Sequence, residues 1–384
     1  MNQSFDAIVI GAGIIGSTTA LALTNAGLKV MVVDRGGVAS GTTSAGEGNI
    51  LVSDKEPGPE LELALYSRNS WFDLNQDIGG GIELEAKGGV VVARSEEGVR
   101  DLMALTRRQI SAGVDAQYLT GSDLRNLEPN LSHSITNGAF YPQDAQCQPM
   151  LAAATVMKSI RDRGGVHRSG LHVRAITVSH GRVSGIVTDQ ETINAPIIIN
   201  AAGTWAGEIA SLAGSSLPIA PRRGFILVSV PTKKLIFHKV YNSEYIANVS
   251  SGDADLQSSA VVEGTQSGTI LIGASRERVG FNSEIDYSVL RILARQAIAL
   301  FPILADLQLL RAYGGFRPYA PDHLPIISED PIVKGLWHNA GHEGAGIGLA
   351  PGSARLITDL ILDRPSFMSA HAFAATRFIS EPVS

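Results

Sequence analysis

The sequence of 384 residues predicts an α/β fold in which a parallel strand–helix–strand unit is joined to a separate, mostly antiparallel sheet. Three observations favour this fold. Residues 7–34 read as an apolar strand, a glycine turn, a helix and a second strand. Residues 218–310 change to strand-rich runs, and from Gly335 the chain returns to a strand, a glycine loop and a helix. A chain of this length exceeds one compact core, so we expect two domains.

The first unit carries the glycine spacing of a dinucleotide-binding turn. Gly11 permits the tight bend, Gly13 lets the backbone approach a pyrophosphate, and Gly16 lets the helix pack close to the strand. The helix begins at Ile14 and Ile15, where free N–H groups and the positive end of the helix dipole face the phosphates. These features predict a Rossmann-like dinucleotide site.

Two further segments extend this predicted site. Asp34 ends the second strand, where its carboxylate can accept hydrogen bonds from ribose hydroxyls, and Arg35 follows it. The hydroxyl-rich loop at residues 41–49 offers hydrogen bonds without bulk, as a segment beside phosphates needs; an ordinary surface loop is the alternative. Its candidate contacts are Thr42, Thr43, Ser44, Glu47, Gly48 and Asn49.

The remaining elements follow from apolar spacing and from stop signals. Helices are expected at residues 60–76, 96–113, 148–163, 287–301 and 352–363. Strands are expected at residues 88–94, 171–178, 182–188, 195–200, 225–230, 269–273 and 336–340. The strand at 195–200 is apolar, as in a buried parallel strand, and ends in a small-residue turn with candidate contacts Ala201, Gly203 and Trp205.

Composition excludes several classes of function. A net charge of −6 and a pI near 5.9 argue against a nucleic-acid surface. The single cysteine, Cys147, excludes an intrachain disulfide and an iron–sulfur cluster held by this chain alone. His323, His338 and His342 lack metal-ligand spacing, so we expect no metal. No basic leader or long apolar run is present, so we expect a cytoplasmic chain without a transmembrane segment.

Four segments resemble the FAD-dependent amino-acid oxidoreductases of the D-amino-acid oxidase, glycine oxidase and sarcosine oxidase superfamily. They are residues 11–34, Thr42-Thr43-Ser44, residues 201–205, and Gly315-Phe316-Arg317-Pro318 with Asp322 and Pro325, followed by the loop 341–348. Within the superfamily, residues 43–49 and 338–351 look most like β subunits of heteromeric dehydrogenases. These include D-hydroxyproline dehydrogenase, octopine and nopaline oxidases, and cyanide-forming glycine dehydrogenase.

The resemblance implies a discontinuous FAD-binding domain and a substrate-binding domain on a mixed, mostly antiparallel sheet. The first would comprise residues 1–86, 147–217 and 312–384, and the second residues 87–146 and 218–311. The FAD would be non-covalent, because no cysteine lies near Phe316. Its adenine would lie near Val173, and its flavin between residues 47–49 and the loop residues Gly344, Ala345, Gly346, Ile347 and Gly348. Several members carry Glu at the position of Asp34, but the shorter acid still reaches the ribose.

The resemblance also assigns the group that holds the substrate carboxylate. Arg317 matches the family's anchor, a guanidinium fork that gives two parallel hydrogen bonds, and an ordinary surface arginine is the alternative. Tyr245 resembles the tyrosine that caps this carboxylate, although Ala247-Asn248 replace the usual Pro-Arg after it. A packing role is the alternative for Tyr245, and Tyr241 is the other candidate.

Three more polar residues in these loops are candidates. His342 and Glu343 are interpreted mainly as residues that shape the loop, because the family mechanism needs no protein base for the Cα–H. For Glu47, our hypothesis is that the carboxylate attracts a cationic substrate nitrogen or tunes its proton loss. A solvated loop charge is the alternative for Glu47.

These inferences together predict a FAD-dependent dehydrogenase that oxidises the C–N bond of an amino or imino acid by hydride transfer to flavin. The substrate would be of the D-hydroxyproline or D-proline type, or an opine such as octopine or nopaline. The chain would act as a catalytic β subunit beside α, and in some assemblies γ, electron-transfer subunits that hold or share FMN or a 2Fe–2S cluster. Association with a membrane through an electron acceptor is a further option. A stand-alone oxidase using O₂ and a non-catalytic flavin electron-transfer subunit are the alternatives.

Overall fold

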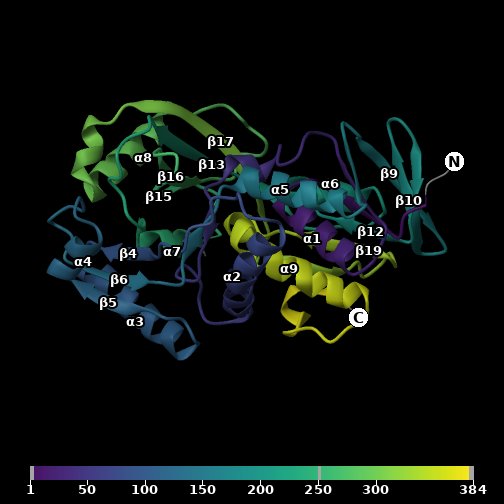
Figure 1. Cartoon of the computed structure of the whole chain (residues 1–384), viewed down its shortest axis with the longest axis horizontal. Coiled ribbons are helices and arrows are strands. Elements are labelled where there is room, and N and C mark those ends of the chain that lie inside the picture. The colour runs from purple at the N-terminus through teal and green to yellow at the C-terminus, as the bar shows by residue number, and fades with distance from the viewer. Residues whose placement is uncertain (1–3, 250–251, 380–384) are drawn as a thin grey trace.

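The computed structural model describes residues 4–249 and 252–379, which form two large sheets lying side by side (Figure 1). One sheet has six strands in the order β18-β19-β12-β1-β2-β8. The other has eight strands in the order β17-β13-β16-β15-β14-β4-β6-β5. The predicted α/β fold with a Rossmann-like unit and a mixed second sheet is confirmed.

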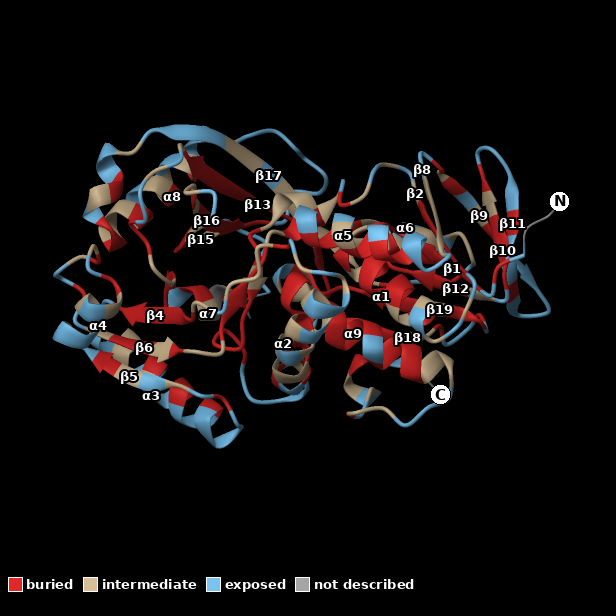
Figure 2. Ribbon diagram, in the orientation of Figure 1, coloured by how far each residue is buried: buried red, intermediate tan, exposed pale blue. Residues whose placement is uncertain are grey.

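The six-stranded sheet is parallel except at one edge, where β18 runs antiparallel to β19. Its apolar strands are buried (Figure 2), because helices cover the sheet. Helix α1 packs against α5 and α9, and α9 packs against α2. The strands are β1 (Ala7–Ile10), β2 (Val30–Asp34), β8 (Val166–Ser169), β12 (Ile197–Asn200), β18 (Ile326–Glu329) and β19 (Leu336–Ala340), and the helices α1 (Ile14–Asn25), α2 (Pro59–Asp77), α5 (Pro149–Asp162), α6 (Ala206–Ser211) and α9 (Gly346–Ile361).

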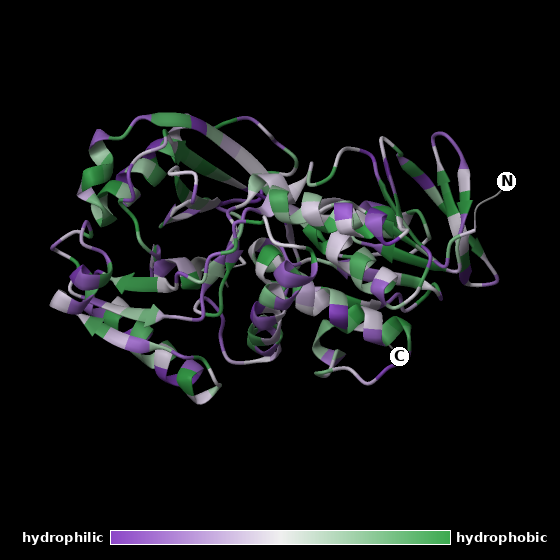
Figure 3. Ribbon diagram, in the orientation of Figure 1, coloured by the Kyte–Doolittle hydropathy of each residue, from purple (hydrophilic) through white to green (hydrophobic). Residues whose placement is uncertain are grey.

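The eight-stranded sheet is antiparallel apart from the parallel pair β14 and β4. Helix α8 packs on β13, β15 and β16, and this interface is apolar (Figure 3). The strands are β4 (Gly89–Ala93), β5 (Gln117–Thr120), β6 (Asn137–Tyr141), β13 (Ala220–Ser229), β14 (Lys239–Asn242), β15 (Gln257–Gly264), β16 (Ile270–Arg276) and β17 (Leu309–Tyr319), and the helices α3 (Glu96–Ser111), α4 (Gly121–Leu127), α7 (Glu244–Val249) and α8 (Tyr287–Leu300).

Two smaller sheets complete the fold. Strands β9 (Val173–Ser179), β10 (Arg182–Thr188) and β11 (Thr192–Asn194) form an antiparallel sheet at the far end of the molecule (Figure 1). Strands β3 (Asn49–Ile50) and β7 (Ala145–Gln146) pair where the chain passes between the two large sheets.

Helix α9 differs from its prediction, because it begins at Gly346 rather than Gly352 and contains Pro351. A proline inside a helix leaves the carbonyl four residues earlier without its N–H partner. Here that carbonyl belongs to Ile347, and the indole N–H of Trp71 donates to it at 2.9 Å. Packing against α2 therefore satisfies the group that the proline leaves open, and the helix starts earlier than the sequence indicated.

Strand membership supports the proposed division into a FAD-binding and a substrate-binding domain. Strands β4, β5, β6 and β13–β16 lie in one sheet, and β1, β2, β8, β12, β18 and β19 lie in the other. Strand β17 begins at Leu309 and pairs with β13 along its length, so the proposed boundary at residue 312 falls inside it. Within residues 4–249 and 252–379, no helix has both the length and the apolar character to span a membrane.

A buried carboxyl group lies between the sheets at Asp144. One oxygen accepts hydrogen bonds from the backbone N–H groups of Val52 and Ser53, at 2.8 and 3.2 Å, and the other is bonded by the Ser53 hydroxyl. Burial raises the pKa of Asp144 to about 7, although these hydrogen bonds oppose the shift. The folded chain therefore binds a proton that the unfolded chain releases near pH 3.8.

We expect this proton to make the stability of the protein depend on pH. Its contribution is complete below about pH 3.8 and is lost as the pH rises through about 7. Between pH 5 and pH 8 the free energy of unfolding should fall by about 2–3 kcal/mol more in the wild type than in Asp144→Asn. Urea unfolding at both pH values measures this difference. Asp162→Asn, a change at an exposed ion pair with Lys158, is the control. An equal loss in wild type and Asp144→Asn would contradict the assignment.

Candidate active site

A cleft of about 320 Å³ is lined by segments from both large sheets. The glycine turn after β1 and the ends of β2 and β12 form one part of it, and β13, β17 and α7 another. It brings together most of the predicted site residues: Gly11, Gly13, Ile14, Ile15, Asp34, Arg35, Thr42, Thr43, Glu47, Asn49, Val173, Ala201, Gly203, Trp205, Tyr245, Arg317, His342, Gly344, Gly346 and Ile347.

Five predicted cofactor contacts do not line the cleft: Gly16, Ser44, Gly48, Ala345 and Gly348. The Ser44 hydroxyl donates to the carbonyl of Gly41 at 3.0 Å and so closes the short turn at Thr42–Ala45. A Cβ at Gly48 would overlap the backbone carbonyl of Cys147. Ala345 lines a second cavity beside the cleft. In this structure these residues shape the walls instead of facing the cleft.

The nucleotide end of the cleft is built from backbone groups. Gly11 has a φ of +116°, and a Cβ there would overlap the carbonyl oxygen of Ala201 at the end of β12. The Asp34 carboxylate accepts from the N–H groups of Ala12 and Gly36, both at 2.7 Å, and so braces the glycine turn. The guanidinium of Arg35 stacks over the Trp205 ring at 4.2 Å and forms the adjoining wall.

The phosphate-binding part is the N-terminus of α1. The first N–H groups of any α-helix lack intrahelical partners. The cap residue of α1, Gly13, has no side chain that could accept from them. The N–H of Ile14 donates to the hydroxyl of Thr43 at 3.0 Å. Free amides, a positive helix end and a wall without side chains fit the pyrophosphate of a dinucleotide. The residues present therefore fit FAD.

A model of the FAD-dependent oxidoreductase family (DAO) matches residues 6–360. The chain belongs to this family. It is 27% identical to glycine oxidase of Geobacillus kaustophilus, with 99% of each chain covered. It is 25% identical to hydrogen cyanide synthase subunit HcnC of Pseudomonas aeruginosa, over 100% of this chain and 99% of that one. It is 27% identical to the bifunctional protein ThiO/ThiG of Synechocystis. That match covers 99% of this chain but 55% of the relative.

Solved structures share the fold. The crystal structure of glycine oxidase from Geobacillus kaustophilus superposes with a TM-score of 0.90 at 24% identity, covering 99% of this chain and 100% of that one. L-proline dehydrogenase from P. horikoshii gives 0.89 at 21% identity, with 98% of each chain covered. These likenesses confirm the α/β fold predicted from the sequence.

Beyond the nucleotide end, Arg317 projects from β17 into the FAD cleft. Its Nη1 donates to the carbonyl of Ser275 at 2.8 Å, and its guanidinium forms no ion pair within the described part of the chain. Burial, and then the nearby charge of Arg276, lower the pKa of Arg317 from its ordinary value. An unpaired guanidinium in such a place is a binding group for an anion.

The structure places the two candidate tyrosines in different surroundings. Tyr245 on α7 is buried and lines the FAD cleft. Tyr241 on β14 is fully buried outside it, and its hydroxyl lies 2.5 Å from the Ser53 Oγ. Tyr241 is therefore wrong as the alternative cap for the substrate carboxylate, and Tyr245 stays the candidate.

Glu47 is buried, so a solvated loop charge is the wrong interpretation of this residue. Its Oε2 lies 3.1 Å from the Asn49 amide nitrogen and 3.5 Å from the ammonium of Lys239, while its Oε1 has no hydrogen-bond partner among the described residues. Lys239 lies closer to Glu263, at 2.6 Å. Burial raises the pKa of Glu47, because the more distant lysine compensates the burial only in part.

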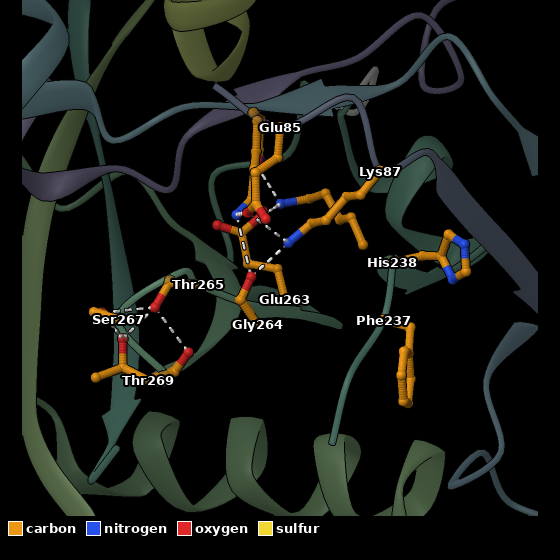
Figure 4. Close-up of polar contacts among 12 residues, drawn as sticks. Glu85, Lys87, Phe237, His238, Glu263, Gly264, Thr265, Ser267 and Thr269 are labelled. Atoms are coloured by element: carbon orange, nitrogen blue, oxygen red, sulfur yellow. Dashed lines mark hydrogen bonds and ion pairs between the residues drawn. The ribbon is translucent and has the colours of Figure 1, made fainter. Parts of the chain in front are cut away.

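Glu263 also lies close to Lys87 and Glu85 (Figure 4). The ammonium of Lys87 donates to the carbonyl of Gly264, next to Glu263, and lies 3.7 Å from Glu85. Burial lowers the pKa of Lys87, while Glu263 and Glu85 oppose the shift. Glu47, Glu85, Lys87, Lys239 and Glu263 thus form one cluster of opposite charges. Of these five residues, Glu47 lines the FAD cleft.

The loop before α9 is held by polar contacts. The His342 ring lies 2.9 Å from the Ser353 hydroxyl, and burial lowers the pKa of His342 to about 3, which keeps it neutral. Glu343 pairs with Arg222 at 2.6 Å and with His323 at 2.9 Å. Burial raises the pKa of Glu343, but these two contacts outweigh it and the net shift is downward. Both side chains therefore hold the loop against neighbouring elements, His342 against α9 and Glu343 against β13, which supports a shaping role.

Sequence reasoning missed two buried cations at the site, Lys239 and Arg276, which are 2% and 3% exposed. Both occur in strands whose other residues are largely buried. A charged residue inside such a strand is the signal that could have indicated them, since a buried charge needs a partner or a ligand.

Gly11→Ala should abolish FAD binding, because the new Cβ collides with the backbone at the end of β12. Gly27→Ala is the matched control: its φ is +94°, but nothing lies within 4 Å of the new Cβ. We expect Gly27→Ala to keep FAD and lose about 1–2 kcal/mol from backbone strain alone. Flavin absorbance per chain and thermal unfolding measure both effects. Full flavin content in Gly11→Ala would show that the turn tolerates a side chain.

Proposed function

We propose that this FAD-dependent oxidoreductase oxidises the C–N bond of an amino or imino acid. The observation that carries the proposal is Arg317, a guanidinium in the FAD cleft that has no ion-pair partner among the residues the structure describes. Bound FAD supplies an acceptor for two electrons and a proton. The chain itself must anchor the carboxylate, orient the carbon beside it and keep the nitrogen neutral when the bond is oxidised.

The residues of the cleft divide these tasks. Arg317 binds the substrate carboxylate through the N–H groups that Ser275 does not occupy. Tyr245 closes the pocket beside it and excludes water. Glu47 offers its free oxygen to the substrate ammonium and accepts a proton from it as the substrate becomes reactive.

The proposed substrates are cyclic D-amino acids of the D-hydroxyproline or D-proline type, or opines such as octopine and nopaline. We propose that the chain is the catalytic β subunit of a hetero-oligomer in the cytoplasm. Partner subunits, carrying FMN or a 2Fe–2S cluster, would remove the electrons, directly or toward a membrane acceptor. The relative named as a subunit of hydrogen cyanide synthase, matched over nearly its full length, supports a multi-subunit enzyme.

A stand-alone oxidase is the second candidate function. It is favoured by the glycine oxidases, which match this chain from end to end. Steady peroxide formation by the isolated chain would favour the oxidase, and slow reaction of the reduced protein with O₂ would favour the dehydrogenase. A non-catalytic electron-transfer subunit would not need an anion-binding arginine in its cleft.

Arg317→Ala should slow flavin reduction by carboxylated substrates by roughly a hundredfold or more, because the anchor is lost. FAD should stay bound, since the nucleotide end of the cleft is built from other residues. Anaerobic bleaching of the flavin by D-proline, cis-4-hydroxy-D-proline, octopine, nopaline, glycine and sarcosine provides the measurement. Arg311→Ala, an exposed arginine on the same strand, is the control. Normal bleaching in Arg317→Ala would remove the basis of the proposed function.

Glu47→Gln should weaken binding of the cationic substrate roughly tenfold and change its pH dependence. In the wild type, binding should strengthen as the pH rises through the raised pKa of Glu47, because only the ionised carboxylate attracts an ammonium. The glutamine variant should lack this step. Glu62→Gln, at an exposed acid on α2, should behave as wild type. Unchanged dissociation constants, turnover and pH profiles in Glu47→Gln would exclude the role.

A further inference from the structure

A second cavity of about 590 Å³ adjoins the FAD cleft. The two cavities share a wall made of Tyr245, Arg317, His342, Glu343 and Gly344. The second cavity extends from this wall past α2 and α3, and many of the side chains around it are charged.

Most of the basic groups around the second cavity already have a carboxylate partner. Lys55 lies 2.8 Å from Asp54 and 3.6 Å from Glu60. Arg108 lies 2.9 Å from Glu56, and His323 lies 2.9 Å from Glu343. These pairs leave two guanidinium groups uncompensated, those of Arg317 and Arg276.

Arg276, at the end of β16, is 3% exposed. Its guanidinium forms no hydrogen bond or ion pair within residues 4–249 and 252–379, and it lies over the Tyr245 ring, 4.9 Å from the ring centroid. Glu343 lies within electrostatic reach but is already bound to Arg222 and His323. Because a buried, unpaired cation is costly, Arg276 indicates an anionic ligand.

The direction of Arg276 distinguishes its ligand from that of Arg317. Arg317 lines both cavities, whereas Arg276 lines the second cavity and not the FAD cleft. Of the two guanidinium groups, that of Arg317 therefore borders the FAD cleft, and a group bound at Arg276 would lie in the second cavity. Acids at the exposed mouth, Glu97, Asp101 and Glu244, lie on α3 and α7 and do not pair with Arg276.

We propose that Arg276 binds a second carboxylate of the substrate, which extends past Tyr245 from the FAD cleft into the second cavity. The substrate is then a dicarboxylic amino or imino acid, with one acid group on each arginine. Two carboxylates neutralise the buried guanidinium of Arg276 and the half-buried guanidinium of Arg317, whereas one would leave a net positive charge in a poorly solvated place. The inference rests on the proposed function, because it assumes that Arg317 anchors the carboxylate next to the oxidised carbon.

Thioether analogues test the second subsite without turnover, because they lack the C–N bond that would be oxidised. The test compares ω-carboxyalkylthioacetates of increasing length with alkylthioacetates of the same length that end in a methyl group. Calorimetry on the FAD-bound protein gives the dissociation constants. At the length that spans both arginines, we expect the dicarboxylate to bind at least tenfold more tightly than its monocarboxylate partner.

Arg276→Met should remove this tenfold advantage and change binding of the monocarboxylates by less than twofold. Arg276→Lys, which keeps the charge, should retain part of the advantage and serves if the methionine variant loses FAD or stability. Arg278→Met removes an exposed arginine just beyond the same strand and should leave every constant unchanged.

Two outcomes would overturn the subsite: no advantage at any length, or an equal loss for both ligand classes in Arg276→Met, which would place Arg276 on the first carboxylate. Failure of the proposed function has a different signature. In that case no amine in the bleaching screen would reduce the flavin, although the dicarboxylate advantage and its dependence on Arg276 were present.

Discussion

The cleft depends on close backbone packing that side chains would prevent. Gly11 lies against the end of β12, where a Cβ would overlap the Ala201 carbonyl. The same constraint positions Arg317 and Glu47, the two side chains proposed to bind the substrate. A Cβ at Gly224 would overlap the guanidinium of Arg317, and a Cβ at Gly273 would overlap the Glu47 carboxylate. Glycines on β13 and β16 therefore create the space in which a cation and an anion reach the FAD cleft.

The pairing of buried charges separates structural groups from binding groups. Lys239 with Glu263 and Arg222 with Glu343 form short ion pairs, and they hold segments of the two sheets in place. Arg317 and Glu47 line the FAD cleft; within the described part of the chain, the guanidinium of Arg317 has no carboxylate partner and one oxygen of Glu47 has no hydrogen-bond donor. Because burying such groups without partners costs free energy, their retention in the cleft is explained most simply by a zwitterionic ligand.

The sequence predicted those parts whose determinants are local. The turn at Gly11–Gly16 and the strand that ends at Asp34 lie within one short stretch, and their spacing alone indicates the fold and the cofactor site. Helix α9 was misplaced because the donor that satisfies Ile347 comes from Trp71, 276 residues earlier. Strand β17 was not predicted because its glycines and Pro318 disfavour strands, yet an edge strand tolerates a proline.

The site residues missed by the sequence have the same physical origin. Neither Arg276 nor Lys239 belongs to a motif, and their roles arise from which groups surround them after the two sheets pack. The tyrosines show this clearly. Tyr241 and Tyr245 lie in one short segment and touch each other edge to face at 5.2 Å, but only Tyr245 reaches the FAD cleft. The sequence shows which chemical groups the side chains carry. It does not show in which direction each side chain points.

Tyr245 also connects the two cavities physically. Its ring lines the FAD cleft, and the guanidinium of Arg276 lies over it on the side of the second cavity. A ligand held at both arginines would pass this ring and restrict its motion, and the ring would in turn restrict the ligand. Fixing a substrate at two ends reduces the freedom of the carbon between them, which favours reaction by orientation rather than by any added acid or base. On this view, the second carboxylate would contribute to rate as well as to recognition.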